Sequence, residues 1–232
     1  MRDTTYKGAT ITALGHDGFR VDVAEPQVSF AFDPYDLLGE VTPVDFVFVS
    51  HSHFDHCDIS SIRKLLGPKT RVIAPQCCQG ELQELAASQL DIYTGEDKVT
   101  AGKITYWAIP AYNTDKFRTP NEVFHPRDLG GVGFVVEIPI QGSKNLRFYH
   151  AGDTDFVPEM EQVKKIDVAF LPISGTFVMT LEEAIKATEL IEPDLTIPMH
   201  YGKILGSVAE ANRFQNLLHD KTNVAVLSTE SI

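Results

Sequence analysis

The chain has 232 residues, of which 43% are hydrophobic and 22% are charged, and its formal net charge is −12 at pH 7. This length and composition are typical of a globular protein, and we expect one domain spanning residues 1–232. The acidic balance argues against binding of long nucleic acids, because affinity for a phosphate backbone depends on many Lys and Arg contacts.

The apolar runs of the chain are short. Those at 44–49 and 168–173 have the length of strands, whereas a helix needs roughly 20 apolar residues to span a membrane. The N-terminal residues Met1 to Tyr6 lack the apolar stretch of a secretory signal. We therefore expect no membrane-spanning segment and a cytoplasmic location.

The first half of the chain is rich in predicted strands. Apolar and β-branched segments are separated by turn residues such as Glu25-Pro26 and Asp33-Pro34. We expect strands at 9–14, 19–23, 29–32 and 46–49, and short helices at about 59–66 and 77–87. Cys77 and Cys78 would begin the second helix as reduced, apolar thiols, because neither they nor Cys57 fit a disulfide framework.

The second half alternates strands and helices. Strands are expected at 104–109, 133–138, 146–149, 168–171, 195–197 and 224–227, and an amphipathic helix at 208–218. The clearest helix runs from Thr180 to Ile191, because Thr180 and Glu183 form a capping box and Pro193 prevents continuation. Strands in both halves with helices on the outer faces indicate an α/β protein in which two packed sheets are covered by helices.

The run His51-Ser52-His53-Phe54-Asp55-His56 carries the functional signal. It follows an apolar strand, so that His51 and His53 can project to the same side while the following turn redirects Asp55 and His56. Neutral imidazoles and a carboxylate suit zinc, manganese or iron. Cys57 is a further candidate ligand, and the alternative to a metal site is a polar loop that caps the next helix.

These residues match the His-x-His-x-Asp-His signature of the metallo-β-lactamase superfamily, which the chain resembles. Downstream, the runs at 149–155 and 197–201 resemble the superfamily segments that bear a metal-bridging aspartate, Asp153, and a last histidine, His200. The amino-acid sequences of these and other segments most resemble those of a branch of uncharacterised metal-dependent hydrolases related to ascorbate-6-phosphate lactonase. The resemblance implies the metallo-β-lactamase fold, a four-layer αββα sandwich of two mixed β-sheets flanked by helices.

The resemblance also implies a ligand set. His51 and His53 would bind a first metal ion, Asp55, His56 and His200 a second, and Asp153 would bridge them. Relatives usually place another histidine for the first metal where this chain has Asn113. Either that site is depleted, or His125 replaces the missing ligand, which we favour. Other polar residues would orient the ligands or contact substrate: His16, Asp33, Asp58, Asn113, His150, Tyr201 and Lys203.

A centre of one or two divalent ions, zinc foremost, would supply a metal-bound hydroxide as nucleophile, so that no serine or cysteine nucleophile is needed. Asp55 and Asp153 are the expected catalytic carboxylates, and Tyr201 and Lys203 could donate to a developing oxyanion. We expect hydrolysis of a small ester, lactone or phosphoester that can be anionic. The alternatives are a phosphodiesterase or nuclease, a di-iron redox protein, for which His53 in place of glutamate is unfavourable, and a metal-free binding module.

Overall fold

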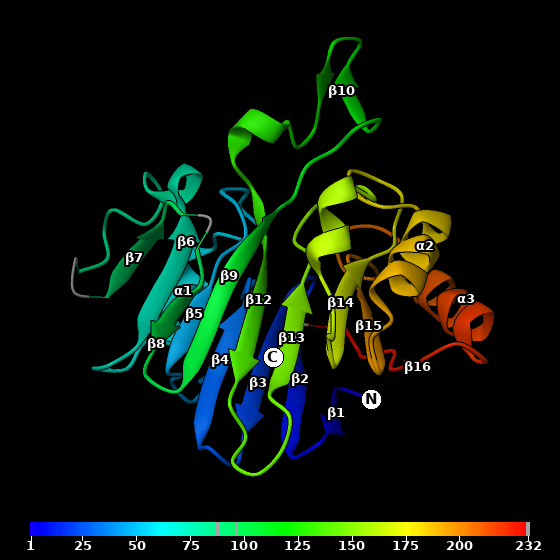
Figure 1. The fold of residues 1–232 in the computed structure, drawn as a ribbon. Helices are drawn as coiled ribbons and strands as arrows, with labels where there is room; N and C mark the ends of the chain where they lie inside the picture. Colours follow the sequence, from blue (N-terminus) through cyan, green and yellow to red (C-terminus); the bar gives the residue numbers. More distant parts are fainter. Residues whose placement is uncertain (87–88, 96, 231–232) are drawn as a thin grey trace. The chain divides into compact units, whose positions relative to one another are not determined.

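The computed structural model describes residues 1–86, 89–95 and 97–230 (Figure 1). Its contacts divide the chain into two compact units, residues 1–95 with 227–232 and residues 96–226. Among the described residues, each unit contains one seven-stranded sheet. The two mixed sheets agree with the predicted α/β class, and the assignment of residues 1–232 to one domain stays a prediction.

The sheet of the first unit has the order β1-β2-β3-β4-β5-β6-β7. Strands β1 to β4 form an antiparallel meander, and β4 to β7 are parallel, which makes the sheet mixed. Because β4 and β5 are parallel neighbours, with Phe32 opposite Phe48, the residues that follow them emerge at the same edge of the sheet. The strands are β1 (Asp3–Tyr6), β2 (Ala9–Gly15), β3 (Gly18–Val23), β4 (Val28–Phe32), β5 (Phe46–Phe48), β6 (Arg71–Pro75) and β7 (Leu90–Tyr93).

Helix α1 (Ile59–Lys64) covers one side of this sheet with Ile62, which is fully buried. It packs into a hydrophobic cluster with Val47 and Val72 of the central strands. Cys57 and Cys78 belong to the same cluster. All three cysteines are free thiols, as predicted, and Cys57 contributes to packing in the core.

The helix predicted at 77–87 is wrong for the part that the structure describes. A short 3-10 helix, η1 (Gln76–Cys78), is followed by turns up to Leu85, and Ala87 lies outside the described residues. Leu82 N–H donates to the Cys78 carbonyl as in an α-helix, whereas Gln79 N–H and Leu85 N–H donate to carbonyls three residues earlier. Gly80 interrupts the segment, and a glycine inside a helix costs about 1 kcal/mol relative to alanine, so this short run does not continue.

The sheet of the second unit has the order β16-β15-β14-β13-β12-β9-β8. It is antiparallel from β8 to β13 and parallel from β13 to β16. The strand predicted at 224–227 ends earlier, at Val224. The strands are β8 (Val99–Ala101), β9 (Ile104–Pro110), β12 (Val132–Ile138), β13 (Leu146–His150), β14 (Val168–Pro172), β15 (Leu195–Met199) and β16 (Asn223–Val224).

Gly133 of β12 allows a close approach to the end of β13. A Cβ atom at this position would lie 2.7 Å from the carbonyl oxygens of both His150 and Ala151, far inside normal contact. Gly152, directly after these residues, has φ +64°, a conformation that glycine adopts without steric cost. Both glycines therefore shape the chain immediately before Asp153.

Two long helices belong to the second unit, α2 (Leu181–Ile191) and α3 (Val208–Leu218). The predicted capping box is confirmed: Thr180 Oγ1 accepts from Glu183 N–H, and Glu183 Oε2 accepts from Thr180 N–H at 2.8 Å. The remaining elements are the hairpin β10 (Phe117–Thr119) and β11 (Glu122–Val123) and the 3-10 helices η2 (Arg127–Leu129) and η3 (Pro158–Gln162). Of the helices in the described parts of the chain, none is long and apolar enough to cross a membrane.

Candidate metal centre

The loop after β5 carries the predicted motif from His51 to His56, and Asp33 follows the neighbouring strand β4. Asp33 is buried and accepts hydrogen bonds from Ser50 N–H at 2.7 Å and from Ser50 Oγ at 2.6 Å. His56 Nδ1 lies 2.7 Å from the same carboxylate. Because a carboxylate accepts rather than donates, His56 carries its proton on Nδ1, and its Nε2 keeps the electron pair that a ligand bond requires.

His51 is oriented in the same way. Its Nδ1 lies 3.0 Å from Ser50 Oγ, whose own proton goes to Asp33, so His51 Nδ1–H is the donor in this contact. His51 Nε2 faces His53 Nδ1 at 3.0 Å. Ser50 and Asp33 thus fix the two buried imidazoles of the motif.

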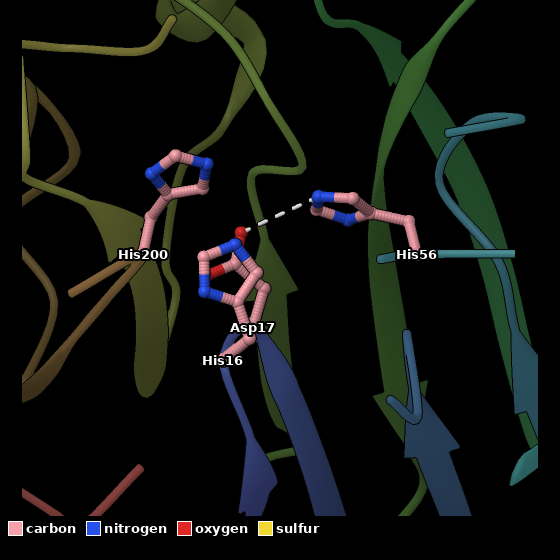
Figure 2. Close-up of side chains that lie close together, drawn as sticks. All are labelled: His16, Asp17, His56 and His200. Atoms are coloured by element: carbon pink, nitrogen blue, oxygen red, sulfur yellow. Dashed lines mark ion pairs between the residues drawn. The ribbon is translucent and has the colours of Figure 1, made fainter. Parts of the chain in front are cut away.

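His16 and Asp17 form the turn between β2 and β3, and both are buried. His16 adopts a left-handed backbone with φ 42°, a conformation that costs energy outside glycine and is concentrated at functional sites. Its Nε2 lies 3.4 Å from Asp55 Oδ2. Asp17 Oδ2 lies 3.7 Å from His56 Nε2, the ion pair that is dashed in Figure 2. His16, Asp17 and His56 offer atoms within 4.8 Å of one another that could hold a metal ion. The N-terminal cluster consists of His16, Asp17, Asp33, Ser50, His51, His53, Asp55 and His56.

Asp17 was not predicted as a site residue. Its sequence context, Gly15-His16-Asp17-Gly18, is that of an ordinary turn, in which aspartate is common. The signal that distinguishes it is complete burial beside His56, and burial of a turn carboxylate is not visible in the local sequence.

In the second unit, His125, Asp153 and His200 come together and are all buried. His125 Nε2 lies 3.2 Å from Asp153 Oδ2, and His200 Nε2 lies 3.4 Å from the same oxygen. Asp153 follows β13, His200 follows β15, and His125 precedes η2. The structure therefore brings together the three candidate ligands that the sequence analysis placed in this part of the chain.

The proton of His200 is also fixed by its surroundings. Its Nδ1 lies 2.8 Å from Ser174 Oγ, which itself donates to the Thr176 carbonyl at 3.2 Å. Since the hydroxyl proton is used there, His200 Nδ1–H is the donor and Nε2 keeps its electron pair. His200 has φ 60°, another left-handed backbone at a candidate ligand.

Asn113, the other candidate for the missing ligand, contacts His125. Asn113 Oδ1 lies 2.9 Å from both the backbone N and the Nδ1 of His125. Its Nδ2 donates to the Phe177 carbonyl at 2.8 Å and to Asp155 Oδ1 at 3.0 Å. The C-terminal cluster consists of Asn113, His125, Asp153, Asp155, Ser174, Phe177 and His200.

The donor set of the C-terminal cluster fits a divalent metal ion. The Nε2 atoms of His125 and His200 carry electron pairs, and both are directed at a carboxylate oxygen of Asp153. Electron pairs that converge in this way repel one another, and a divalent cation bound among them would remove this repulsion. Neutral imidazole and carboxylate are the usual protein ligands of zinc, manganese and iron.

A nearby group of carboxylates has a different role. Asp115, Asp155 and Glu183 also offer oxygens within 4.8 Å of one another, but the Lys116 ammonium lies 3.2 Å from Asp155 and 3.0 Å from Glu183 and contacts Asp115. Burial opposes the charge of Lys116, yet its hydrogen bonds to Asp115 and Glu183 and the charge of Asp155 outweigh this effect and raise the pKa of Lys116. An ammonium group neutralises these carboxylates, which makes a metal ion unnecessary there.

Asp58, a predicted site residue, contacts the first turn of helix α1. Asp58 is the N-cap of α1 and accepts from Ser60 N–H at 2.9 Å, Ser61 Oγ at 2.6 Å and Asp36 N–H at 3.0 Å. Burial opposes its charge, but these hydrogen bonds prevail and lower the pKa of Asp58. Asp58 thus stabilises a helix end.

The other three candidates lie near the ends of β13 and β15. His150 is buried beside Phe170, with ring centroids 6.0 Å apart, and its Nδ1 accepts from Gly152 N–H at 3.3 Å. Tyr201 is fully buried and Lys203 is half-buried. His150 therefore supports the turn before Asp153, and Tyr201 and Lys203 directly follow His200.

The chain is similar to known proteins in sequence and in fold. A model of the Beta-lactamase superfamily domain matches residues 20–201. A UPF0173 metal-dependent hydrolase of Aeropyrum pernix is 32% identical, with 94% of each chain covered. A solved structure from Parabacteroides distasonis, assigned as a metal-dependent hydrolase, has a TM-score of 0.79 at 26% identity and covers 98% of this chain and 99% of its own.

A structure from Thermotoga maritima, assigned as a zinc-dependent hydrolase of the metallo-β-lactamase superfamily, has a TM-score of 0.59 at 21% identity, with 94% of this chain and 97% of that chain covered. At this identity the likeness concerns the fold, and it supports the predicted metallo-β-lactamase fold. The family itself is shown by the match to the superfamily domain and by the relative from Aeropyrum. The chain belongs to the UPF0173 family of metal-dependent hydrolases, within the metallo-β-lactamase superfamily.

Proposed function

We propose that this hydrolase cleaves a small ester, lactone or phosphoester with one or two divalent metal ions, zinc foremost. The observation that carries the proposal is the convergence of His125 Nε2 and His200 Nε2 on Asp153 Oδ2, with each imidazole proton held on Nδ1 by an acceptor. The proposed ligands are His51, His53, Asp55 and His56 of the N-terminal cluster and His125, Asp153 and His200 of the C-terminal cluster.

Bound divalent ions would supply Lewis acidity and lower the pKa of a water molecule to about 7. The chain's own residues prepare for this chemistry. Asp33 and Ser50 hold the ring protons of His56 and His51, and Ser174 holds that of His200, so that each Nε2 keeps its electron pair for a ligand bond. No serine or cysteine nucleophile is required, which agrees with Cys57 lying in the hydrophobic core.

Asp55 and Asp153 are the proposed catalytic carboxylates. Asp153 faces two imidazoles, which suits a bridging ligand. Asp55 is half-buried and lies 3.4 Å from His16 Nε2, so His16 can orient this carboxylate or share a proton with it. Tyr201 and Lys203, which follow His200, are proposed donors to the oxyanion that forms during hydrolysis.

A lactone is the substrate class that we favour for the first tests. The segments around the ligands resemble the branch related to ascorbate-6-phosphate lactonase, and a cationic centre attracts an anionic substrate. The net charge of −12 disfavours extended nucleic acids as substrates, because binding to a phosphate backbone depends on many Lys and Arg contacts. Small phosphodiesters belong in the same panel of substrates, and a cytoplasmic location stays a prediction.

The test combines metal analysis with a panel of esters, lactones and phosphodiesters. Wild-type protein should contain divalent metal and hydrolyse at least one of these classes, and His51→Ala and Asp153→Ala should abolish that activity. His219→Ala is the matched control, because His219 is exposed at the end of α3 and its removal should leave metal content and activity unchanged. Full activity of the metal-stripped wild-type protein would contradict the proposal.

A further inference from the structure

Asn113 lies in the segment between β9 and β10 and is 5% exposed. Both polar atoms of its side chain are used in hydrogen bonds to buried or half-buried partners. Its carbonyl oxygen faces the backbone N–H and the ring of His125, and its amide nitrogen faces Asp155 and the Phe177 carbonyl. The backbone adds a further link, since Asn113 N–H donates to the His125 carbonyl at 2.8 Å. Asn113 and His125 are thus joined by three hydrogen bonds.

The donors and acceptors in this group fix the orientation of the Asn113 amide and favour one tautomer of His125. Asp155 and the Phe177 carbonyl can only accept, which places the amide NH₂ of Asn113 toward them and its oxygen toward His125. His125 Nδ1 then faces two acceptors, Asn113 Oδ1 at 2.9 Å and the Phe177 carbonyl at 3.1 Å. Nε2 faces one acceptor, Asp153 Oδ2 at 3.2 Å. The two acceptors at Nδ1 therefore favour the Nδ1–H tautomer of a neutral His125, in which the Nε2 electron pair is directed at Asp153.

Asp155 fixes Asn113 in turn. This buried carboxylate accepts from Asn113 Nδ2 and from the backbone N–H groups of Thr114 at 2.6 Å and Asp115 at 3.1 Å. Lys116 adds an ion pair to Asp155 at 3.2 Å and reaches Glu183 of α2. Asp155 is two residues from Asp153, so the segment that holds Asn113 is anchored to the loop that carries the proposed bridging ligand.

We propose that Asn113 is a positioning residue for His125: its side-chain oxygen selects the Nδ1–H tautomer and sets the ring so that Nε2 faces Asp153, while Asp155 holds the Asn113 amide. The inference rests on the proposed function, in which His125 is a metal ligand. Asn113 therefore supports the ligand that replaces the histidine expected at its own position. Groups that orient a ligating histidine are worth roughly 10–100-fold in metal affinity.

The experiment compares wild-type protein with Asn113→Ala, Asn113→Asp and a control, Asn121→Ala. Asn121 is an exposed asparagine in the turn between β10 and β11 of the same segment. The imidazole tautomer is read from long-range ¹H–¹⁵N spectra of the metal-free protein, with the His125 signals identified by their loss in His125→Ala. Zinc affinity is measured by competition with a chromophoric chelator.

Wild-type protein should show His125 as the Nδ1–H tautomer. Asn113→Ala leaves only the longer contact to the Phe177 carbonyl, so both tautomers should be populated and zinc should bind roughly 10–100-fold more weakly. Asn113→Asp keeps an oxygen for His125 and should retain the tautomer, with affinity between those of wild type and Asn113→Ala. Asn121→Ala should match wild type in both measurements.

Two different failures can be told apart. If His125→Ala binds zinc as tightly and in the same amount as wild type, His125 is not a ligand and the proposed ligand set is wrong at this position. If His125→Ala loses zinc but Asn113→Ala keeps both the tautomer and the affinity, the ligand assignment stands and the positioning role of Asn113 is refuted. A mixed tautomer in Asn113→Asp would equally refute selection by the side-chain oxygen.

Discussion

Ser174 Oγ lies 2.8 Å from His200 Nδ1 and donates its own proton to the Thr176 carbonyl. The two residues follow the neighbouring parallel strands β14 and β15, so the pairing of these strands brings the hydroxyl next to the imidazole. A serine that is not a nucleophile thereby determines which ring nitrogen of His200 faces Asp153.

Ser174→Ala removes this acceptor and should weaken metal binding. His200 would lose the group that holds its Nδ1 proton, and such losses typically cost about 10–100-fold in metal affinity or activity. Zinc competition and hydrolysis assays would measure the effect. The control is Ser143→Ala, since Ser143 is an exposed turn residue of the same unit. Equal zinc affinity of Ser174→Ala and wild type would show that His200 needs no such support.

Asp33→Asn is the corresponding change in the N-terminal cluster. Asparagine keeps the size of Asp33 but puts an NH₂ group among Ser50 N–H, Ser50 Oγ and His56 Nδ1, all three of which approach the present carboxylate. One contact must become a clash of donors or His56 must move its proton to Nε2, which removes a ligand atom. We expect metal affinity to fall by about 10–100-fold.

Metal content after dialysis against a chelator of known affinity would measure this change. Asp22→Asn is the control, because Asp22 on β3 pairs with Arg20 at the surface and its side chain is 42% exposed. If Asp33→Asn and Asp22→Asn retain the same amount of metal as wild type, Asp33 does not act through His56.

The motif at 51–56 could be recognised from the sequence because its residues are neighbours in the chain, and one loop after a buried strand holds all of them. Asp153 and His200 could be placed through the superfamily resemblance. Asp33 was among the residues expected to orient the ligands, but its partner could not be predicted, because His56 lies 23 residues away. Ser174 was not predicted as a site residue, and it lies 26 residues from His200. Their positions depend on which strands are neighbours in the sheet, and local sequence patterns do not determine strand order.

The choice between Asn113 and His125 shows the same limit. Sequence alone offered both as candidates for one ligand position, because either side chain could occupy it. The structure gives them complementary surroundings, since Asn113 uses its polar atoms on His125, Asp155 and Phe177. The helix predicted from Thr180 to Ile191 is confirmed, and a capping box begins it. The helix predicted at 77–87 is wrong for the described residues, where no side chain caps the first turn.

Asp58→Ala separates helix capping from metal binding. Asp58 was a candidate site residue, but its contacts are those of an N-cap. Loss of an N-cap typically costs about 1 kcal/mol of stability, so the free energy of unfolding should fall by about this amount. Metal affinity should stay at the wild-type value. Urea denaturation and zinc competition measure the two quantities, and a large loss of affinity without a loss of stability would return Asp58 to the metal site.

Lys116→Met should destabilise the protein in a pH-dependent manner. Lys116 lies among Asp155, Glu183 and Asp115, and a hydrogen-bonded charge of this kind contributes about 1–3 kcal/mol. Burial lowers the pKa of Lys116. The hydrogen bonds and the nearby carboxylates raise this pKa by more than burial lowers it, so the pKa lies above its ordinary value. Above the unfolded-state pKa of about 10.4, the native state therefore holds a proton that the unfolded state has lost.

The contribution of Lys116 should accordingly be complete at pH 7 to 9 and decrease as the pH rises above about 10.4 toward the raised native pKa. Urea denaturation of wild type and Lys116→Met from pH 7 to 11 tests this sign: the difference in unfolding free energy should be constant up to about pH 10 and then shrink. Lys186→Met, on an exposed position of α2, is the control and should show little difference at any pH. A difference between wild type and Lys116→Met that grows with alkaline pH would mean that the carboxylates around Lys116 do not stabilise its charged form.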